Sequence, residues 1–525
     1  MAPSLRGTVL ASLLLLSVPL AHAHPLHTDC KPPKLVRRQT VSTGEGSAPS
    51  GPTSSTESAG YSCDASTCKL PDCLCASTSP PGGLSPTDVP QFVTFTSDDA
   101  MQSYTLEVLN YFFADRKNPN GCPVKTTFFN SLTYNNFSMI TDFYVAGNEV
   151  ADHTMTHVGA PNASEINGNL AALNAFSGIP LADLAGFRAP MLNFTADTLT
   201  TLHESDFLYD SSATAATPAD AAGTDAFWPY TLDNGLSNNC LDVENVCQGK
   251  LKLPGLWEIP MYATFAGDNA ADIHLMDPWL DSANVSDVVE WMKSSFLTHY
   301  NGNRQPFGIY SHPIHLAVGY PGVTDPNETR DAIKGFLDWL QTHDNVWFVT
   351  NQMMLDWIRN PVTNANIASS SALTCEVPDV PTTTKICNGI EVNELGLLDQ
   401  CPFIDFPWTT CYGCPTVPPT PDNPVPPQNT SIGGVRHRLP TNCSTPFFDP
   451  IANTCLCDSS SCAFTDTTRP IGNYSSGTGT DGSSSAVPSA TSIPRQASAA
   501  DKRLVVQVGL SVALGVAAVL IAKWA

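Results

Sequence analysis

The sequence predicts an α/β fold, a barrel of alternating strands and helices, over residues 88–362. Apolar, strand-like runs occur at Phe92–Thr96, Lys125–Phe129 and Pro306–Ser311, and each enters a loop. Apolar residues spaced three and four apart predict amphipathic helices at Ser103–Ala114 and Asp331–Gln341. In such a barrel the strand ends carry the functional site, so the polar residues that follow the apolar runs are the first candidates.

Two adjacent carboxylates, Asp98 and Asp99, close the first apolar run, and His153 and His157 follow a later one. One carboxylate and two imidazoles form a set of three ligands that leaves a divalent metal with open positions. The second carboxylate is then free to act as a base on water. Taken alone, an Asp-Asp pair usually caps a helix or forms a turn, and histidines four residues apart are common on helices.

Two further motifs carry polar residues of chemical interest. In Phe187-Arg188-Ala189-Pro190 the arginine can orient a carboxylate through a forked hydrogen bond, although a surface arginine beside a turn is an equally valid interpretation. Ile309-Tyr310-Ser311-His312 ends an apolar strand in a histidine, which suits a general acid. His315 competes for that role, and a neutral loop histidine is the plain alternative for both.

Together these motifs resemble the chitin deacetylases of the polysaccharide deacetylase family, carbohydrate esterase family 4. The resemblance covers about residues 61–362 and is carried by four motifs in order: Thr94–Ala100, His153–His157, Phe187–Pro190 and Ile309–His312. It implies a distorted (β/α) barrel of the polysaccharide deacetylase type, accompanied here by small disulfide-rich modules. It also implies hydrolysis of the N-acetyl groups of N-acetylglucosamine residues in chitin, which gives chitosan and acetate.

The resemblance also implies a role for each motif residue. The expected set is Asp98 as general base, Asp99, His153 and His157 as ligands of a divalent metal, usually zinc, Arg188 as the group that orients the base, His312 as general acid, and Pro190 and Met191 as substrate-binding residues.

The chain departs from the family pattern in two motifs. Ser97 stands directly before the aspartate pair where the family has phenylalanine, so either Ser97 replaces that residue or two residues are inserted. Met191 stands where the family has tyrosine, and its backbone N–H can still serve an oxyanion hole. An acidic residue that supports the arginine is expected, and Asp210 and Glu258 are both candidates, with a structural role equally open to each.

Both ends of the chain carry processing signals. Residues 1–23 are typical of a secretory signal peptide, and cleavage after Arg38 would remove residues 24–38 as a propeptide. Residues 500–525 match a GPI-anchor signal, with a transmembrane helix as the alternative. The expected segments between them are a Ser/Thr/Gly linker at 39–60, a cysteine-rich segment at 61–87, the polysaccharide deacetylase catalytic domain at 88–362, a Cys/Pro-rich module at 370–465 and a Ser/Thr/Gly stalk at 466–499.

Cysteine usage and sequons indicate an exported glycoprotein. Seventeen cysteines predict disulfides, and loss of Cys30 with the propeptide would leave an even number. Asn-x-Ser/Thr sequons, which are candidate glycan sites, occur at Asn136, Asn162, Asn193, Asn284, Asn327, Asn429, Asn442 and Asn473. The aromatic residues Phe403, Phe406 and Trp408 of the Cys/Pro-rich module suit either polysaccharide binding or a small core.

The formal charge of −24, without a concentrated basic cluster, argues against a nucleic acid partner. We therefore expect a secreted enzyme that acts on chitin or chitin oligosaccharides, held by a lipid anchor at the outer face of the plasma membrane or in the cell wall. A catalytically weakened, carbohydrate-binding wall protein is the alternative, motivated by the altered first and third motifs.

Overall fold

The structure is a computed structural model that describes residues 61–240, 243–247, 249–267, 272–375, 387, 391–403, 408–438, 448–449, 451 and 454–455. The predicted signal peptide, propeptide, linker, stalk and anchor signal lie outside the described residues. Among the described residues, no helix has the length and apolar character needed to cross a bilayer.

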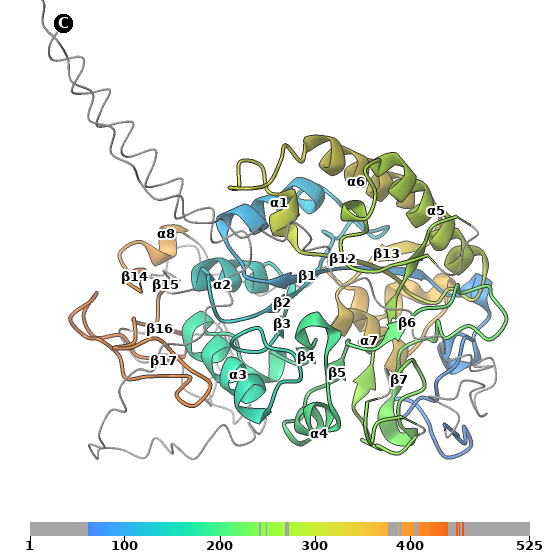
Figure 1. Cartoon of the computed structure of the whole chain (residues 1–525), viewed down its shortest axis with the longest axis horizontal. Coiled ribbons are helices and arrows are strands. Elements are labelled where there is room, and N and C mark those ends of the chain that lie inside the picture. Colours follow the sequence, from blue (N-terminus) through green and yellow to red (C-terminus); the bar gives the residue numbers. More distant parts are fainter. Residues whose placement is uncertain are drawn as a thin grey trace, which may run out of the picture. The chain divides into compact units, whose positions relative to one another are not determined.

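Strands and α-helices alternate over residues 91–204 and again over residues 285–359, as the sequence predicts, whereas the seven short strands between residues 209 and 274 follow one another without an α-helix among the described residues (Figure 1). The strands are β1 Gln91–Asp99, β2 Thr127–Asn130, β3 Glu149–Asp152, β4 Gly186–Phe187, β5 Tyr209–Asp210, β6 Thr214–Ala215, β7 Tyr230–Thr231, β8 Trp257–Glu258, β9 Met261–Tyr262, β10 Thr264–Phe265, β11 Ile273–His274, β12 Phe307–Ser311 and β13 Val346–Phe348. The helices are α1 Ser103–Phe113, α2 Phe137–Val145, α3 Ala163–Ser177, α4 Ala196–Glu204, α5 Val285–Asn301, α6 Asn327–Leu340 and α7 Asn351–Arg359.

The main sheet has the order β12-β1-β2-β3-β4-β5-β8-β7, with β13 also paired to β1. All of its pairs are parallel except β7 with β8. Several middle strands are only two residues long, so the sheet is an irregular barrel wall. This confirms the predicted distorted α/β barrel, and its parallel strands bring the ends of β1, β3, β4 and β12 to one edge of the sheet.

Strand β1 pairs with β2, β12 and β13, and its apolar run is buried on both faces. Phe95 packs edge-to-face on Phe113 of α1, and Phe92 packs on Trp357 of α7. Val93 to Ser97 pair consecutively with Phe307 to Ser311 of β12, and the register with β2 is also unbroken from Thr96 to Asp99. Because an insertion would produce a bulge, the continuous register favours replacement of one residue by Ser97.

Six disulfides connect described cysteines, which fits an oxidising compartment. They join Cys63 with Cys75, Cys68 with Cys73, Cys122 with Cys375, Cys240 with Cys247, Cys387 with Cys411, and Cys401 with Cys414. The remaining cysteines, Cys30 among them, contribute no described side chain.

The described part of the Cys/Pro-rich module includes α8 Glu391–Glu394 and the hairpin of β14 Asp399–Cys401 with β15 Trp408–Thr410. Short strands β16 Phe448–Asp449 and β17 Thr454–Cys455 follow. Trp408 is 1% exposed and lies 4.8 Å and 5.1 Å, between ring centroids, from Phe176 and Phe137 of the barrel helices. Trp408 is therefore a core residue and not an exposed residue that binds polysaccharide. Phe406 lies outside the described residues.

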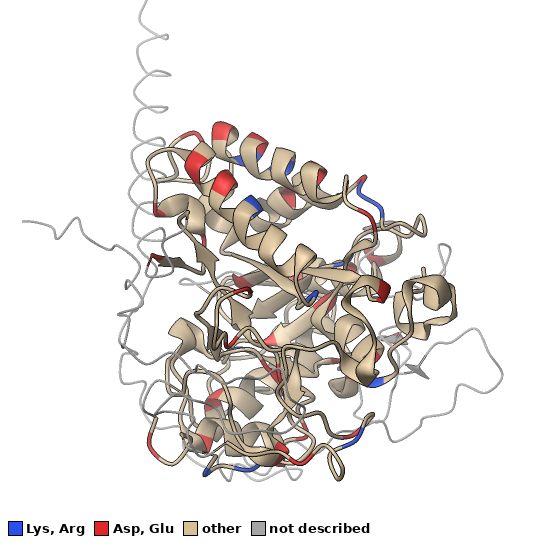
Figure 2. Ribbon diagram, turned by 90° about the vertical axis from the view of Figure 1, so that its right-hand side faces the viewer, with Lys and Arg blue, Asp and Glu red and all other residues tan. Residues whose placement is uncertain are grey.

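Acidic residues are spread over the outer helices, and lysine and arginine are sparse, as Figure 2 shows. Several basic side chains are engaged in local pairs: Arg330 forms a fork with Glu107, and Arg116 contacts Asp338. The acidic residues of the described part of the chain are thus spread over its surface.

Candidate active site

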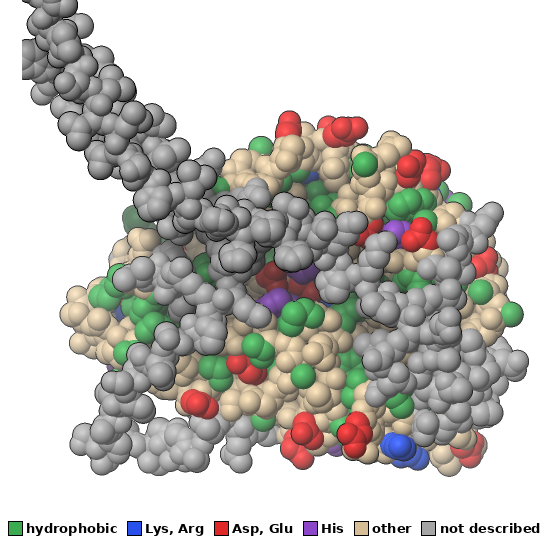
Figure 3. Space-filling view, in the orientation of Figure 1, with side chains coloured by type: hydrophobic (Ala, Val, Ile, Leu, Met, Phe, Trp, Pro, Cys, Tyr) green, Lys and Arg blue, Asp and Glu red, His purple; other side chains and the backbone are tan. Residues whose placement is uncertain are grey.

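Asp99, His153 and His157 converge beyond the ends of β1 and β3. One ligand atom from each lies within 4.8 Å of the other two. Nε2 of His157 is 3.1 Å from Oδ1 of Asp99, and Nε2 of His153 is 3.8 Å from the same oxygen. Figure 3 shows histidine and acidic side chains together in a hollow of this face. The structure thus brings together the three residues that the sequence predicts as metal ligands.

The protonation of His153 suits a metal ligand. Its Nδ1 lies 2.8 Å from the carbonyl oxygen of Arg188, and because a carbonyl only accepts, Nδ1 must carry the proton. Burial lowers the pKa of His153 to about 4, so the ring is neutral and Nε2 offers a lone pair. The buried Oδ1 of Asp99 accepts no well-aligned hydrogen bond within the described chain, so this oxygen is free to coordinate a cation.

Charge also favours an ionised Asp99. Burial by itself raises the pKa of this carboxyl, but contact with His157 and the nearby charge of His312 hold it well below its usual value. For His157 burial acts in the opposite sense and lowers the pKa. The contact with Asp99 more than offsets this effect, so the pKa of His157 is raised overall. A carboxylate and a neutral imidazole are the donor types that zinc prefers, and the residues present therefore fit a divalent metal.

The backbone holds this set of ligands in a strained geometry. Asp99, Thr154 and His157 have φ values of 87°, 63° and 56°, in the left-handed region that non-glycine residues avoid. The carboxylate of Asp152 accepts the N–H of Thr154 at 2.7 Å, and Ser131 donates its hydroxyl to the carbonyl of His153 at 2.8 Å. The two histidines lie on a loop after β3 rather than on a helix, and these contacts fix that loop.

Asp98 lies beside the three ligands and is held by Arg188. The guanidinium Nη1 donates to Oδ1 of Asp98 at 2.7 Å and to Oγ1 of Thr96 at 2.8 Å. The other carboxylate oxygen of Asp98 lies 3.9 Å from Nε2 of His153. Arg188 is fully buried, stacks over the Phe129 ring at 4.1 Å, and donates twice to Ser211. This arrangement aims one oxygen of Asp98 into the site.

Neither candidate acidic residue hydrogen-bonds directly to Arg188 in the described structure. Asp210 accepts from the backbone N–H and hydroxyl of Ser212, and Glu258 accepts from the N–H of Ala213. They are register partners on β5 and β8. Burial raises the pKa of Asp210 to about 6 and that of Glu258 well above its usual value, and the charge of Arg188 opposes both shifts. Their influence on Arg188 is electrostatic.

His312 follows β12 and is paired with a carboxylate that the sequence analysis missed. Its Nδ1 lies 2.5 Å from Oδ2 of Asp277, and its backbone N–H donates to Oδ1 at 2.9 Å. Burial would lower the pKa of His312, but the charge and hydrogen bond of Asp277 raise it to about 10. Asp277 and Pro278 lie in a turn, and the sequence around them has no regular apolar pattern or motif that predicts a functional residue.

Pro190 and Met191 lie in the 3₁₀ turn Pro190–Leu192, which is separated from Arg188 by Ala189. Pro190 is buried, whereas Met191 is 59% exposed and has a φ of 55°. An added Cβ on Gly159 would lie 3.1 Å from Cε of Met191, so the methionine side chain covers the loop that carries His157. Met191 is therefore a surface residue at the edge of the site.

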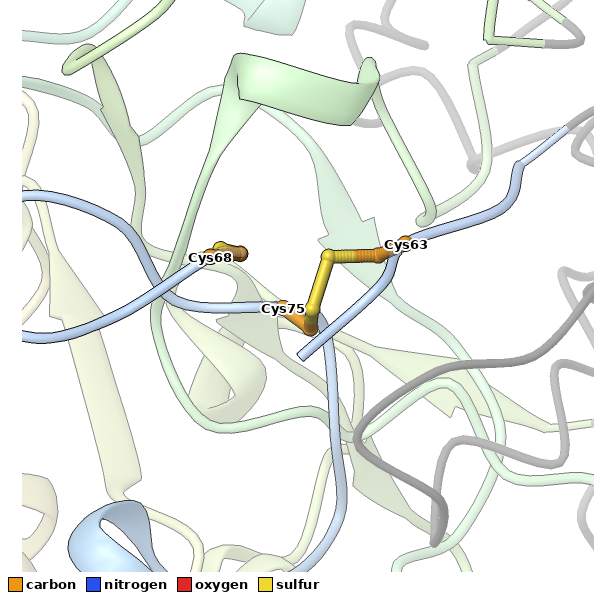
Figure 4. Close-up of side chains that lie close together, drawn as sticks. All are labelled: Cys63, Cys68 and Cys75. Carbon is orange, nitrogen blue, oxygen red and sulfur yellow. A yellow bond between two sulfur atoms is a disulfide. The ribbon is translucent and has the colours of Figure 1, made fainter. Parts of the chain in front are cut away.

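Cys63, Cys68 and Cys75 form another cluster with metal-like spacing (Figure 4). Cys63 is joined to Cys75, and Cys68 is joined to Cys73. Because a disulfide sulfur is not a thiolate, this cluster is structural.

Three predicted glycan sites are helix N-caps: the side-chain oxygens of Asn136, Asn162 and Asn284 accept backbone N–H groups of α2, α3 and α5. The exposed sequon asparagines are Asn162, Asn193, Asn284 and Asn327; Asn136 and Asn429 are half-buried, and Asn442 and Asn473 lie outside the described residues.

Comparison with known proteins identifies relatives of this chain. No family model matches it. Chitin deacetylase 8 of Bombyx mori is 31% identical over 315 residues, which are 57% of this chain and 78% of that protein. Chitin deacetylase 1 of Bombyx mori is 29% identical over 381 residues, 66% of this chain and 67% of that protein.

Solved structures with some similarity include a putative polysaccharide deacetylase from Mycobacterium smegmatis, at 19% identity and a TM-score of 0.32 over 58% of this chain and all of that one. A family 4 carbohydrate esterase from Streptomyces lividans has 15% identity and a TM-score of 0.26 over 49% of this chain and 92% of that one. On its 31% identity with chitin deacetylase 8 of Bombyx mori, of which it covers 78%, the chain belongs to the chitin deacetylases.

Proposed function

We propose that this chain is a metal-dependent deacetylase that removes the acetyl group from N-acetylglucosamine residues of chitin and yields chitosan and acetate. The observation that carries the proposal is the convergence of Asp99, His153 and His157, with Asp98 and His312 beside them. The kinship with chitin deacetylases supports an enzyme that acts on a polysaccharide.

The Asp99, His153 and His157 side chains would hold a divalent ion, zinc by the donor types present. That ion would supply a Lewis acid that acidifies water and polarises the acetyl carbonyl. Asp98 takes a proton from the attacking water, because its second oxygen faces the site while Arg188 holds the first. The left-handed turn at Met191 offers a backbone N–H to the negative charge that develops on the acetyl oxygen.

The amine of the sugar leaves only if it is protonated. His312 is placed to donate that proton, since Asp277 keeps the His312 ring in the imidazolium form. Asp98 and His312 thus act as base and acid from different strand ends, β1 and β12. Pro190 and Met191 contact the substrate at the edge of the site.

Acetate release from chitin oligosaccharides tests the proposal. Asp98→Asn and His312→Ala should each abolish it, whereas the exposed α4 residue His203 serves as a control, and His203→Ala should retain full activity. Full activity in both site variants would refute the assigned roles.

The exposed Met191 in the third motif favours one second candidate, a wall protein that binds carbohydrate with weakened catalysis. A stoichiometric metal measurement paired with the acetate assay separates the two candidates. Metal and oligosaccharide binding without acetate release would support the second.

We also propose that the chain is exported and held by a GPI anchor at the outer face of the plasma membrane, with glycans on its sequons. The disulfides support an oxidising compartment, and the C-terminal apolar stretch after small residues supports the anchor. Release from intact cells by a phosphatidylinositol-specific phospholipase is the expected result; retention after that treatment would indicate a transmembrane helix instead.

A further inference from the structure

A second group of metal-binding residues lies beside the first. Asp277, His312 and His315 each place one ligand atom within 4.8 Å of the other two. This group shares no residue with the set formed by Asp99, His153 and His157. It offers the same donors, one carboxylate and two imidazoles, which zinc prefers.

Two proline-led turns hold this second group together. Asp277 and His312 are the N-caps of the 3₁₀ turns Pro278–Leu280 and Pro313–Leu316. Proline fixes the first backbone angle of each turn, so both caps are stiff. The N–H of Asp277 donates to the carbonyl of Tyr310 at 3.0 Å, which ties its turn to the end of β12.

The geometry of the turn places the third residue, His315, close to His312. Side chains three residues apart lie over one another in a 3₁₀ turn, and the rings of His312 and His315 have centroids 5.7 Å apart. His315 is exposed, and its ring nitrogens make no hydrogen bond with any described residue. Its imidazole is therefore available to a ligand from solvent.

We infer that Asp277, His312 and His315 form a second, inhibitory zinc site. The inference rests on the proposed role of His312 as proton donor. When zinc is present above the amount that fills the first site, it binds between the Asp277 carboxylate and the two rings, and the proton that the His312 ring gives up passes to solvent. A His312 ring that coordinates zinc cannot also act as the imidazolium that protonates the leaving amine, so deacetylation stops while the first site stays filled.

The test uses the full chain and zinc as the probe. Bound zinc is counted by elemental mass spectrometry at increasing free zinc, and acetate release is measured in the same samples. The wild-type chain should bind a second equivalent, and its activity should fall as that equivalent binds. In His315→Ala and His315→Gln the second equivalent should weaken at least about tenfold, since even outer partners of metal ligands contribute roughly 10–100-fold.

His203→Ala is the matched control, because it removes an exposed histidine elsewhere and should bind and respond like the wild type. Basal acetate release at low zinc should stay unchanged in the His315 variants. A wild-type chain that binds a single equivalent, or His315 variants that bind the second as tightly as the wild type, would overturn the inference. If no acetate is released at any zinc concentration, the proposed function fails, and the zinc count alone still decides whether the second site exists.

Discussion

Oδ2 of Asp277 lies 2.5 Å from Nδ1 of His312, and the other oxygen of that carboxylate accepts the backbone N–H of the same histidine at 2.9 Å. The pair joins two turns that are 35 residues apart in the sequence. One carboxylate thereby sets both the orientation and the charge of the proposed acid.

Asp277→Asn should move the alkaline limb of the pH profile to lower pH. Asp277 raises the pKa of His312 to about 10, while burial acts in the opposite direction. Without this carboxylate only the charges of Asp99 and Asp98 oppose the effect of burial, so the pKa of His312 falls, the ring loses its proton at lower pH, and kcat/KM declines earlier. The measurement is acetate release between about pH 5 and 10. Asp281→Asn is the control, because Asp281 makes a similar contact of 2.8 Å with His274. An unchanged limb in Asp277→Asn would contradict the assigned acid.

Arg188→Lys should lower kcat with little change in folding. The guanidinium donates to Thr96, Asp98 and Ser211 from a fully buried position, and an ammonium group cannot reproduce this planar fork. We expect a loss of about 100-fold in acetate release, the size typical of a misplaced catalytic group. Arg330→Lys, which changes a buried fork to Glu107 away from the site, should keep its activity. Equal losses in the two variants would point to a general effect on stability.

A chelator should lower both activity and thermal stability. Asp99 and the two histidines are bound to one cation in the proposed enzyme, and removing a ligand present at about 100 to 1,000 times its Kd costs about 3–4 kcal/mol. Differential scanning fluorimetry should therefore report a lower Tm with chelator, restored by added zinc. Asp99→Asn provides the comparison, since its Tm should respond little to the chelator. If the Tm of the wild type does not change when the chelator is added, that result would argue against a resident metal.

Trp408→Ala should destabilise the barrel without removing a catalytic group. Its ring packs edge-to-face on Phe137, Phe176 and Phe403, so the substitution leaves a large cavity. Loss of a buried tryptophan typically costs about 3–5 kcal/mol, measured by denaturant unfolding. Val417→Ala, at a residue 49% exposed, should cost far less. A small loss in Trp408→Ala would mean that the hairpin of β14 and β15 folds apart from the barrel.

Glu258→Gln should flatten the pH dependence of stability in mildly acidic solution. Burial raises the pKa of Asp210 from 3.8 to about 6 and raises that of Glu258 well above its usual value, so the folded chain retains protons that the unfolded chain releases. The free energy of unfolding should therefore fall as pH rises through the window from 3.8 to about 6 for Asp210. A pKa displaced by that much corresponds to about 3 kcal/mol. The substitution removes one of the two acids, and equally steep profiles in the variant and the wild type would sink this account.

The strand ends could be predicted from sequence because apolar runs and the residues that follow them are local patterns. Asp98, Asp99 and His312 each lie within or directly after a strand whose apolar core is visible in the sequence. The two-residue strands β4 to β9 could not be found this way, since their pairing depends on the barrel. Asp277 could not be predicted for the same reason. It has a φ of 46°, and its backbone N–H finds a partner only at the end of β12.

The Cys122–Cys375 disulfide spans 253 residues and encloses most of the barrel in one covalent ring. A protease that cuts one surface loop inside that ring leaves two fragments that stay linked and cannot diffuse apart. Nicked and intact chains would then migrate alike on a gel until a reductant separates them. If the enzyme is exported as proposed, a single cleavage of this kind by a protease need not inactivate it.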